Sequence, residues 1–187
     1  MANLDFPRGL QPHEAVLHKR EYVIPNSLTG NVNLFVWDPV ILTGTGNEVD
    51  IAVQGNGNPI MGSVLALYDS NGDPLQSYVD ASGGGTCIVS DDPFQYYIIQ
   101  GDGDSSFLDL DDAGGNINLV SGTGSTVNFR SGWELDDSET GDGTVDDQIR
   151  LVKPAARVDN TVGIANADWV CFINNHQRLQ GVVGVGV

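Results

Sequence analysis

The side chains that could carry out chemistry in this 187-residue chain are few and widely separated. The three histidines are His13, His18 and His176, and the two cysteines are Cys87 and Cys171. A zinc site needs three or four nitrogen or sulfur ligands at tetrahedral positions, and the spacing of the histidines favours surface placement instead. The sequence has neither a Gly-x-Ser-x-Gly nucleophile motif nor a phosphate-binding Gly-x-x-x-x-Gly-Lys-Ser/Thr motif. We therefore expect no enzymatic activity.

One acidic loop, residues 136–147, has a donor spacing that suits calcium, which prefers oxygen ligands at alternating loop positions. It resembles an EF-hand loop, but the flanking helices are absent and its last residue is Asp rather than the longer Glu. Acidic, glycine-rich segments between strands are mostly turns. We therefore interpret this segment first as a turn and expect no cofactor. A bound calcium ion is the alternative. The candidate ligands are Asp136, Ser138, Thr140 and Asp147.

The two cysteines allow one disulfide, but nothing in the sequence brings them together. Cys171 lies within an apolar run, Trp169–Ile173, and Cys87 follows a glycine-rich stretch. A cysteine in an apolar run is most often a buried, unreactive thiol. We expect this state for Cys171, and a catalytic Cys–His pair is disfavoured because it would need an exposed thiol.

The charge of the chain is strongly negative, and it is unevenly distributed. The formal net charge is −17, and residues 21–129 contain 14 acidic side chains without a single Lys or Arg. Nucleic-acid and anionic membrane partners are disfavoured because both need clustered cations. The first residues also lack the features of a secretory signal, so we expect assembly in the cytoplasm. The two ends are slightly basic, and two interpretations stay open: simply an acidic soluble protein, or a molecule whose ends engage a partner while its acidic middle faces solvent.

The elements that must position these residues are predicted to be strands. Twenty-four glycines and eight prolines punctuate short β-branched and aromatic runs, and turn signals recur every 8–12 residues. This pattern predicts an all-β fold, an antiparallel β-sandwich or barrel. Residues 61–79 are expected to form a hairpin around the turn at 69–73. The remaining expected strands are 21–24, 31–36, 40–42, 49–53, 86–89, 94–100, 116–120, 125–130, 147–153, 158–162 and 168–174.

Both ends of the chain differ from this β-domain, which is expected to cover residues 21–177. Prolines and a glycine make a helix or a regular strand unfavourable over residues 1–12, although apolar side chains recur there. Residues 1–20 are therefore expected to be an extended arm that becomes ordered on a neighbouring subunit. Residues 178–187 form a Gly/Val-rich tail that could pair with a sheet edge. The expected contact residues of the arm are Leu4, Phe6, Pro7, Arg8 and Leu10.

Several segments, taken together and in order, resemble small head proteins of tailed bacteriophages. The opening Met-Ala-Asn start leads into Pro7-Arg-Gly-Leu-Gln-Pro12, and the similarity then continues over nearly the whole chain. By its resemblance in these segments, the chain is identified as a member of the capsid decoration, or cement, protein family. The segments that follow the opening are Trp37–Val40, Asn58–Val64, Asp91–Gln100, Ser131–Asp136 and Phe172–Gln177.

The resemblance implies a β-rich structural protein of the virion, not an enzyme. Such proteins are often trimeric and sit on the outer surface of the mature head, where they bridge major capsid subunits and stabilise the shell. We therefore expect a homotrimer whose partner is the major capsid protein, with no direct nucleic-acid or membrane contact. Two other classes stay open: another β-structured virion component, such as a tail or adaptor protein, and a calcium- or glycan-binding β-sandwich module.

Overall fold

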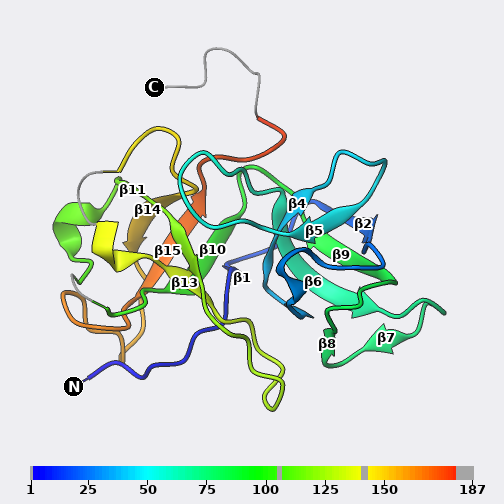
Figure 1. Ribbon diagram of the computed structural model, residues 1–187. Coiled ribbons are helices and arrows are strands. Elements are labelled where there is room, and N and C mark those ends of the chain that lie inside the picture. The colour runs from blue at the N-terminus through cyan, green and yellow to red at the C-terminus, as the bar shows by residue number, and fades with distance from the viewer. Residues whose placement is uncertain (1, 105–106, 140–142, 180–187) are drawn as a thin grey trace.

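The computed structural model describes residues 2–104, 107–139 and 143–179. Every pairing between its named strands is antiparallel, and the described residues contain no α-helix. The all-β prediction is therefore confirmed. No sheet of the described residues closes into a barrel, so the architecture is sandwich-like. In Figure 1 the strands form two groups that lie side by side, with β10, β11 and β13–β15 at the left and β2–β9 at the right.

The first group is a five-stranded sheet in the order β1-β10-β15-β14-β11, accompanied by a separate two-stranded pair. Buried and less buried side chains alternate along much of β10 and β14, as in a half-buried antiparallel sheet, whereas the first four residues of the central strand β15 are all buried. In β10, for example, Tyr97 and Ile99 are buried and Ile98 between them is less so. The sheet strands are β1 (Gln11–Pro12), β10 (Tyr96–Gln100), β15 (Asp168–Ile173), β14 (Ile149–Pro154) and β11 (Asn116–Ile117), and the pair is β12 (Leu119–Ser121) with β13 (Trp133–Leu135).

The second group is built on β2-β9-β6-β4-β5, with β7 paired to β6 and a separate β3–β8 pair. Its strands are β2 (Lys19–Val23), β9 (Thr86–Ser90), β6 (Gly62–Tyr68), β4 (Pro39–Leu42), β5 (Val49–Ile51), β7 (Pro74–Leu75), β3 (Leu34–Phe35) and β8 (Tyr78–Val79). Three short 3-10 turns complete the described elements: η1 (Thr29–Asn31), η2 (Leu110–Asp112) and η3 (Asp137–Glu139).

Each group encloses its own cluster of buried apolar side chains. Ile51 of β5 packs against both clusters and so joins them. The larger side chains of the first cluster include Leu10, Tyr97, Leu119, Trp133, Leu135 and Trp169, and those of the second include Tyr22, Leu34, Val40, Met61, Val64 and Leu67.

The chain from Gly9 to Val23 links the two groups. The N–H of Leu10 donates to the Trp37 carbonyl at 2.9 Å, and the Ser63 hydroxyl donates to the Leu10 carbonyl at 2.7 Å. Gly9 has a φ of 75°, and a Cβ there would lie 2.3 Å from both the Ser131 hydroxyl oxygen and the Trp37 carbonyl oxygen. Only glycine fits this passage, because it alone combines a positive φ with the absence of a side chain.

Several predicted strands are present, and others are wrong. The hairpin around 69–73 forms through Leu67 and Leu75, but Tyr78 and Val79 pair with β3 instead. Residues 158–162 form no strand, because the Asn160 amide accepts from the Asp168 N–H and donates to two backbone carbonyls. Side chains that bond to nearby backbone in this way compete with regular strands. Residues 125–130 likewise form only one isolated bridge, and the short strand β13 was not predicted.

The N-terminal boundary also differs from expectation. The expected limit between residues 20 and 21 falls within β2, and residues 11–12 already belong to β1. Leu10 was expected to contact a neighbouring subunit, but its side chain is fully buried in the first cluster of its own chain. The prediction that Leu10 contacts a neighbouring subunit is wrong, because Gly9 lets the backbone approach the Trp37 carbonyl closely and so places Leu10 in the core. In the tail, residues 180–187 lie outside the described residues, whereas Arg178 and Leu179 are described.

We predict that Leu10→Ala lowers the free energy of unfolding by ~2–5 kcal/mol, because it removes a fully buried side chain and leaves a cavity. Leu4→Ala is the matched control: Leu4 is 74% exposed, and we expect a change within ~0.5 kcal/mol. Urea denaturation of both variants measures the difference. Equal stabilities would show that Leu10 is not part of the core.

Candidate functional site

The N-terminal segment, residues 2–10, lies on its own chain rather than extending freely. The Asn3 amide donates to the Thr161 carbonyl at 2.8 Å and to the Ala165 carbonyl at 2.9 Å. Its oxygen also accepts from the Thr161 N–H at 2.8 Å. One side chain thus fixes the first residues of the segment to the loop before β15.

The Gln100 side chain at the end of β10 holds the middle of the same segment. Its oxygen accepts from the Phe6 N–H at 2.8 Å, and its amide donates to the Leu4 carbonyl at 2.8 Å and the Asn166 carbonyl at 3.0 Å. This amide acts in place of a neighbouring strand, because it satisfies backbone groups on both sides of Asp5.

A buried carboxylate fixes the end of the segment. The Arg8 guanidinium donates to both Asp168 oxygens, at 2.9 and 3.1 Å, and Arg157 donates to Asp168 Oδ2 as well. Arg157 also pairs with Asp159 at 2.9 Å. The Asp168 side chain is only 6% exposed, so its charge requires close cationic partners.

A second buried carboxylate, Asp91, also pairs with two arginines, one of which lies near the C-terminus. The Asp91 side chain is fully buried and pairs with Arg178 at 2.9 Å and with Arg20 at 3.5 Å. The Tyr22 hydroxyl donates to it at 2.7 Å. Burial and the adjacent Asp91 carboxylate raise the pKa of Tyr22 to about 12. Arg178, the first residue of the expected tail, is therefore fastened to the body of the chain.

These contacts leave a surface group that we call the N-terminal patch, in which Leu4 and Phe6 are exposed and Pro7, Arg8 and Arg130 are half-buried. Leu4 is 74% and Phe6 39% exposed. The Arg130 guanidinium lies 3.4 Å from the Phe6 ring centroid, in a cation–π contact. The structure therefore brings together four of the five expected contact residues, and it adds Arg130, whose position 122 residues beyond Arg8 gave no signal in the sequence.

The expected calcium loop is occupied by its own hydrogen bonds where it is described. The Asp136 carboxylate accepts from the Ser138 N–H and hydroxyl, and Asp147 accepts from the Thr144 N–H and hydroxyl and from the Asn118 amide. Thr140 lies outside the described residues. Among the residues that are described, no group of three or more His, Cys, Asp or Glu side chains is placed to hold a metal ion. Calcium binding stays a prediction.

Glu134 of β13 lies in an acidic environment. Burial raises the pKa of Glu134 to about 8, and the negative charges of Asp5, Asp102, Asp104 and Asp137 act in the same direction. Burial and these charges together disfavour an ionised Glu134 at neutral pH.

His176 and both cysteines are buried, whereas His18 is exposed and His13 is half-buried, so the surface placement expected for the histidines is wrong for His176. His176 is 1% exposed, and burial lowers its pKa to about 4, with the positive charge of Arg178 acting in the same direction. Cys87 and Cys171 are both buried and free, as expected for Cys171. Burial raises the pKa of both thiols, to about 12 for Cys87, so neither forms a thiolate readily.

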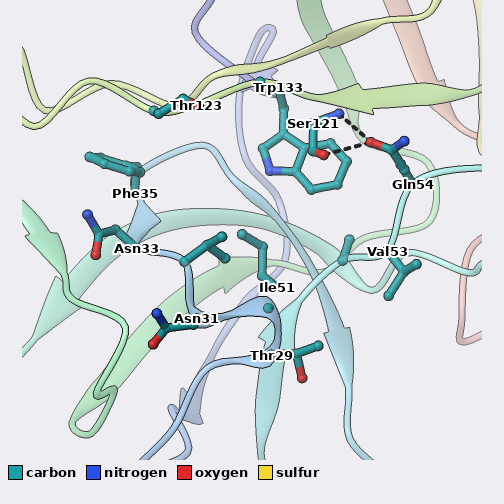
Figure 2. Close-up of a pocket in the computed structure, with 15 residues that line it drawn as sticks. Thr29, Asn31, Asn33, Phe35, Ile51, Val53, Gln54, Ser121, Thr123 and Trp133 are labelled. Carbon is teal, nitrogen blue, oxygen red and sulfur yellow. Dashed lines mark hydrogen bonds between the residues drawn. The ribbon is translucent and has the colours of Figure 1, made fainter.

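A cavity of about 520 Å³ lies where the two groups of strands meet, and sequence reasoning did not find it. Figure 2 shows Phe35 and Trp133 well separated along it, with Ile51 below Trp133 and Val53 further along, on the side of Gln54. The side-chain amide oxygen of Gln54 accepts from the Ser121 N–H at 2.9 Å and from its hydroxyl at 2.6 Å. The other lining residues are Thr29, Gly30, Asn31, Val32, Asn33, Ala52, Gly122, Thr123 and Gly124.

Comparison with known proteins adds no further assignment: no family model, curated protein or solved structure matches the chain. The described part of the chain contains no helix with the length and hydrophobicity that a bilayer crossing requires.

We predict that Asp168→Asn lowers the free energy of unfolding by ~2–4 kcal/mol, because it removes the buried charge shared by Arg8 and Arg157. Trypsin should then cleave after Arg8 faster than in the parent protein. Asp159→Asn is the control, since Asp159 also pairs with Arg157 but is 65% exposed, and its loss should cost less than ~1 kcal/mol. Similar losses from both substitutions would contradict the assignment.

We predict that Glu134→Gln stabilises the protein at alkaline pH. The pKa of Glu134 in the folded protein lies above its ordinary value of 4.5, so the folded state binds the proton more tightly and loses stability as pH rises from about 4.5 to 8. The variant should be more stable by ~1–3 kcal/mol above pH ~8 and should match the parent below pH ~4. Urea denaturation across this pH range measures the free energy of unfolding of both proteins. The contributions of the other titrating groups cancel in the difference between them. A difference that is independent of pH would refute the raised pKa.

Proposed function

We propose that the chain is a decoration, or cement, protein of a tailed-bacteriophage capsid, and that it binds the outer surface of the mature head. Two kinds of observation support this. The order of segments that resemble phage head proteins extends from the N-terminus to residue 177. The fold is all-β, and it presents the first residues of the chain in a fixed conformation.

The observation that carries the proposal is the N-terminal patch. On a chain with a net charge of −17, Leu4 and Phe6 expose apolar surface beside Arg8 and Arg130. Apolar surface combined with arginine is typical of residues that dominate protein–protein interfaces. Because the segment is already held by Asn3, Gln100 and Asp168, binding would cost less conformational entropy than ordering a free arm.

The proposed assembly is a homotrimer that bridges major capsid subunits. Each copy would place one N-terminal patch on the shell, and three weak contacts acting together would give strong binding through avidity. A closed three-fold ring uses the same heterologous contact three times. The acidic remainder of the surface would then face solvent and keep virions apart.

A direct test compares Leu4→Asp with Leu110→Asp. Both leucines are largely exposed, at 74% and 69%, so neither substitution should affect folding. The parent protein should bind expanded capsids saturably, in multiples of three copies, and bind unexpanded capsids less. Burial of one leucine contributes ~1.5–3 kcal/mol, so Leu4→Asp should weaken binding at least ~10-fold, whereas Leu110→Asp should not change it.

Three results would contradict the proposal. Co-purification with tails and not with capsids would indicate a tail or adaptor protein. A failure to bind any capsid would show that the protein is not a component of the phage head. Equal losses for the two leucine variants would show that the N-terminal patch is not the contact surface.

A further inference from the structure

The cavity between the two groups of strands differs from the rest of the molecular surface in its charge. None of its fifteen lining residues is Asp, Glu, Lys, Arg or His, although the chain contains 25 acidic residues. Asp50, which follows Val49 in β5, directs its carboxylate to the Thr29 N–H and hydroxyl instead. A charged ligand would lose hydration in this cavity without gaining an opposite charge. The lining therefore selects a neutral ligand.

The cavity also contains polar groups that are not used within the chain. In the described residues, the side-chain amides of Asn31 and Asn33 and the Thr123 hydroxyl make no hydrogen bond, and Figure 2 draws none from the Trp133 indole to another lining residue. These groups are donors and acceptors that a ligand can satisfy. A purely apolar ligand would leave those it covers unpaired, which is costly.

Beside these polar groups, the cavity also has apolar surface. Val32 and Val53 are 42% and 47% exposed and supply accessible apolar surface. Phe35 and Trp133 also line the cavity, and each is only 3% exposed. Sugars combine apolar C–H faces, which pack on aromatic and aliphatic surface, with hydroxyl groups that bond to amides. We propose that this cavity is a binding site for a neutral saccharide. Its volume of about 520 Å³ is within the range of ~300–1,000 Å³ that is usual for small-molecule sites.

Close backbone packing keeps the cavity in shape before a ligand arrives. A Cβ at Gly124 would lie 2.3 Å from the Phe35 ring, and a Cβ at Gly132 would lie 2.7 Å from the Gly122 backbone. The glycines thus let the 121–132 segment approach both itself and Phe35. A preformed site saves the entropy that a ligand would otherwise have to offset. This site does not depend on the capsid proposal, because it is complete within one chain.

The experiment uses the indole N–H signals of the isolated protein in heteronuclear NMR. The chain has three tryptophans, and Trp133→Phe identifies the signal of Trp133. The neutral probes are maltohexaose, cellohexaose and triacetylchitotriose, and the comparison probes are anionic polygalacturonate and apolar 1-hexanol. At least one neutral saccharide should shift the Trp133 signal saturably while leaving those of Trp37 and Trp169 in place.

Val53→Glu places a charge at the exposed edge of the cavity and should weaken saccharide binding at least ~10-fold. Val158→Glu is the matched control on a fully exposed valine outside the cavity, and it should bind like the parent. Asn33→Ala is a second test that adds no charge, and it should weaken binding ~3–10-fold through the loss of one hydrogen-bonding group.

Three outcomes would overturn the inference. In the first, no neutral saccharide shifts the Trp133 signal. In the second, only hexanol or polygalacturonate does so, which would assign the cavity to a different ligand class. In the third, Val53→Glu and Asn33→Ala bind saccharide as tightly as the parent, which would place the site elsewhere on the chain.

Discussion

The arrangement of this chain depends on two buried aspartates, each of which is neutralised by two arginines. Asp91 pairs with Arg20 and Arg178, and Asp168 pairs with Arg8 and Arg157. A carboxylate that is removed from water needs such partners, because its desolvation is not otherwise compensated. The chain has only eight Lys and Arg side chains, and four of them serve this purpose. The two aspartates thereby fix the chain near both of its ends, and the Asp168 network positions the N-terminal patch.

This pairing changes the meaning of the charge distribution along the sequence. The slightly basic ends suggested contact with a partner, but most of their arginines neutralise acidic side chains of the same chain. The sequence could not distinguish Asp91 or Asp168 from the other acidic residues, because burial is set by the assembled sheets. Under the proposed function, the contact surface is smaller and more specific: the exposed side chains of Leu4 and Phe6 beside Arg8 and Arg130.

The sequence predicted the all-β class well, because short apolar runs such as 62–68, and above all the β-branched and aromatic run 168–173, are bounded by turn residues and favour strands. It failed where tertiary contacts decide. Trp133–Leu135 is too short to give a periodic signal, and Leu10 lies among prolines that suggest exposure although Gly9 admits it to the core. The cavity could not be predicted at all, since its walls come from residues 29–35, 51–54, 121–124 and 133, which only the fold brings together.

The positions of the two buried cysteines make them probes of local unfolding. Cys87 belongs to the second apolar cluster and Cys171 to the first, and neither is bonded to the other. A thiol reagent can reach each sulfur only when the surrounding cluster opens. The chain therefore contains two internal reporters, one for each half, and the rates at which they are labelled record whether the halves open together, as their shared contact at Ile51 implies, or one before the other.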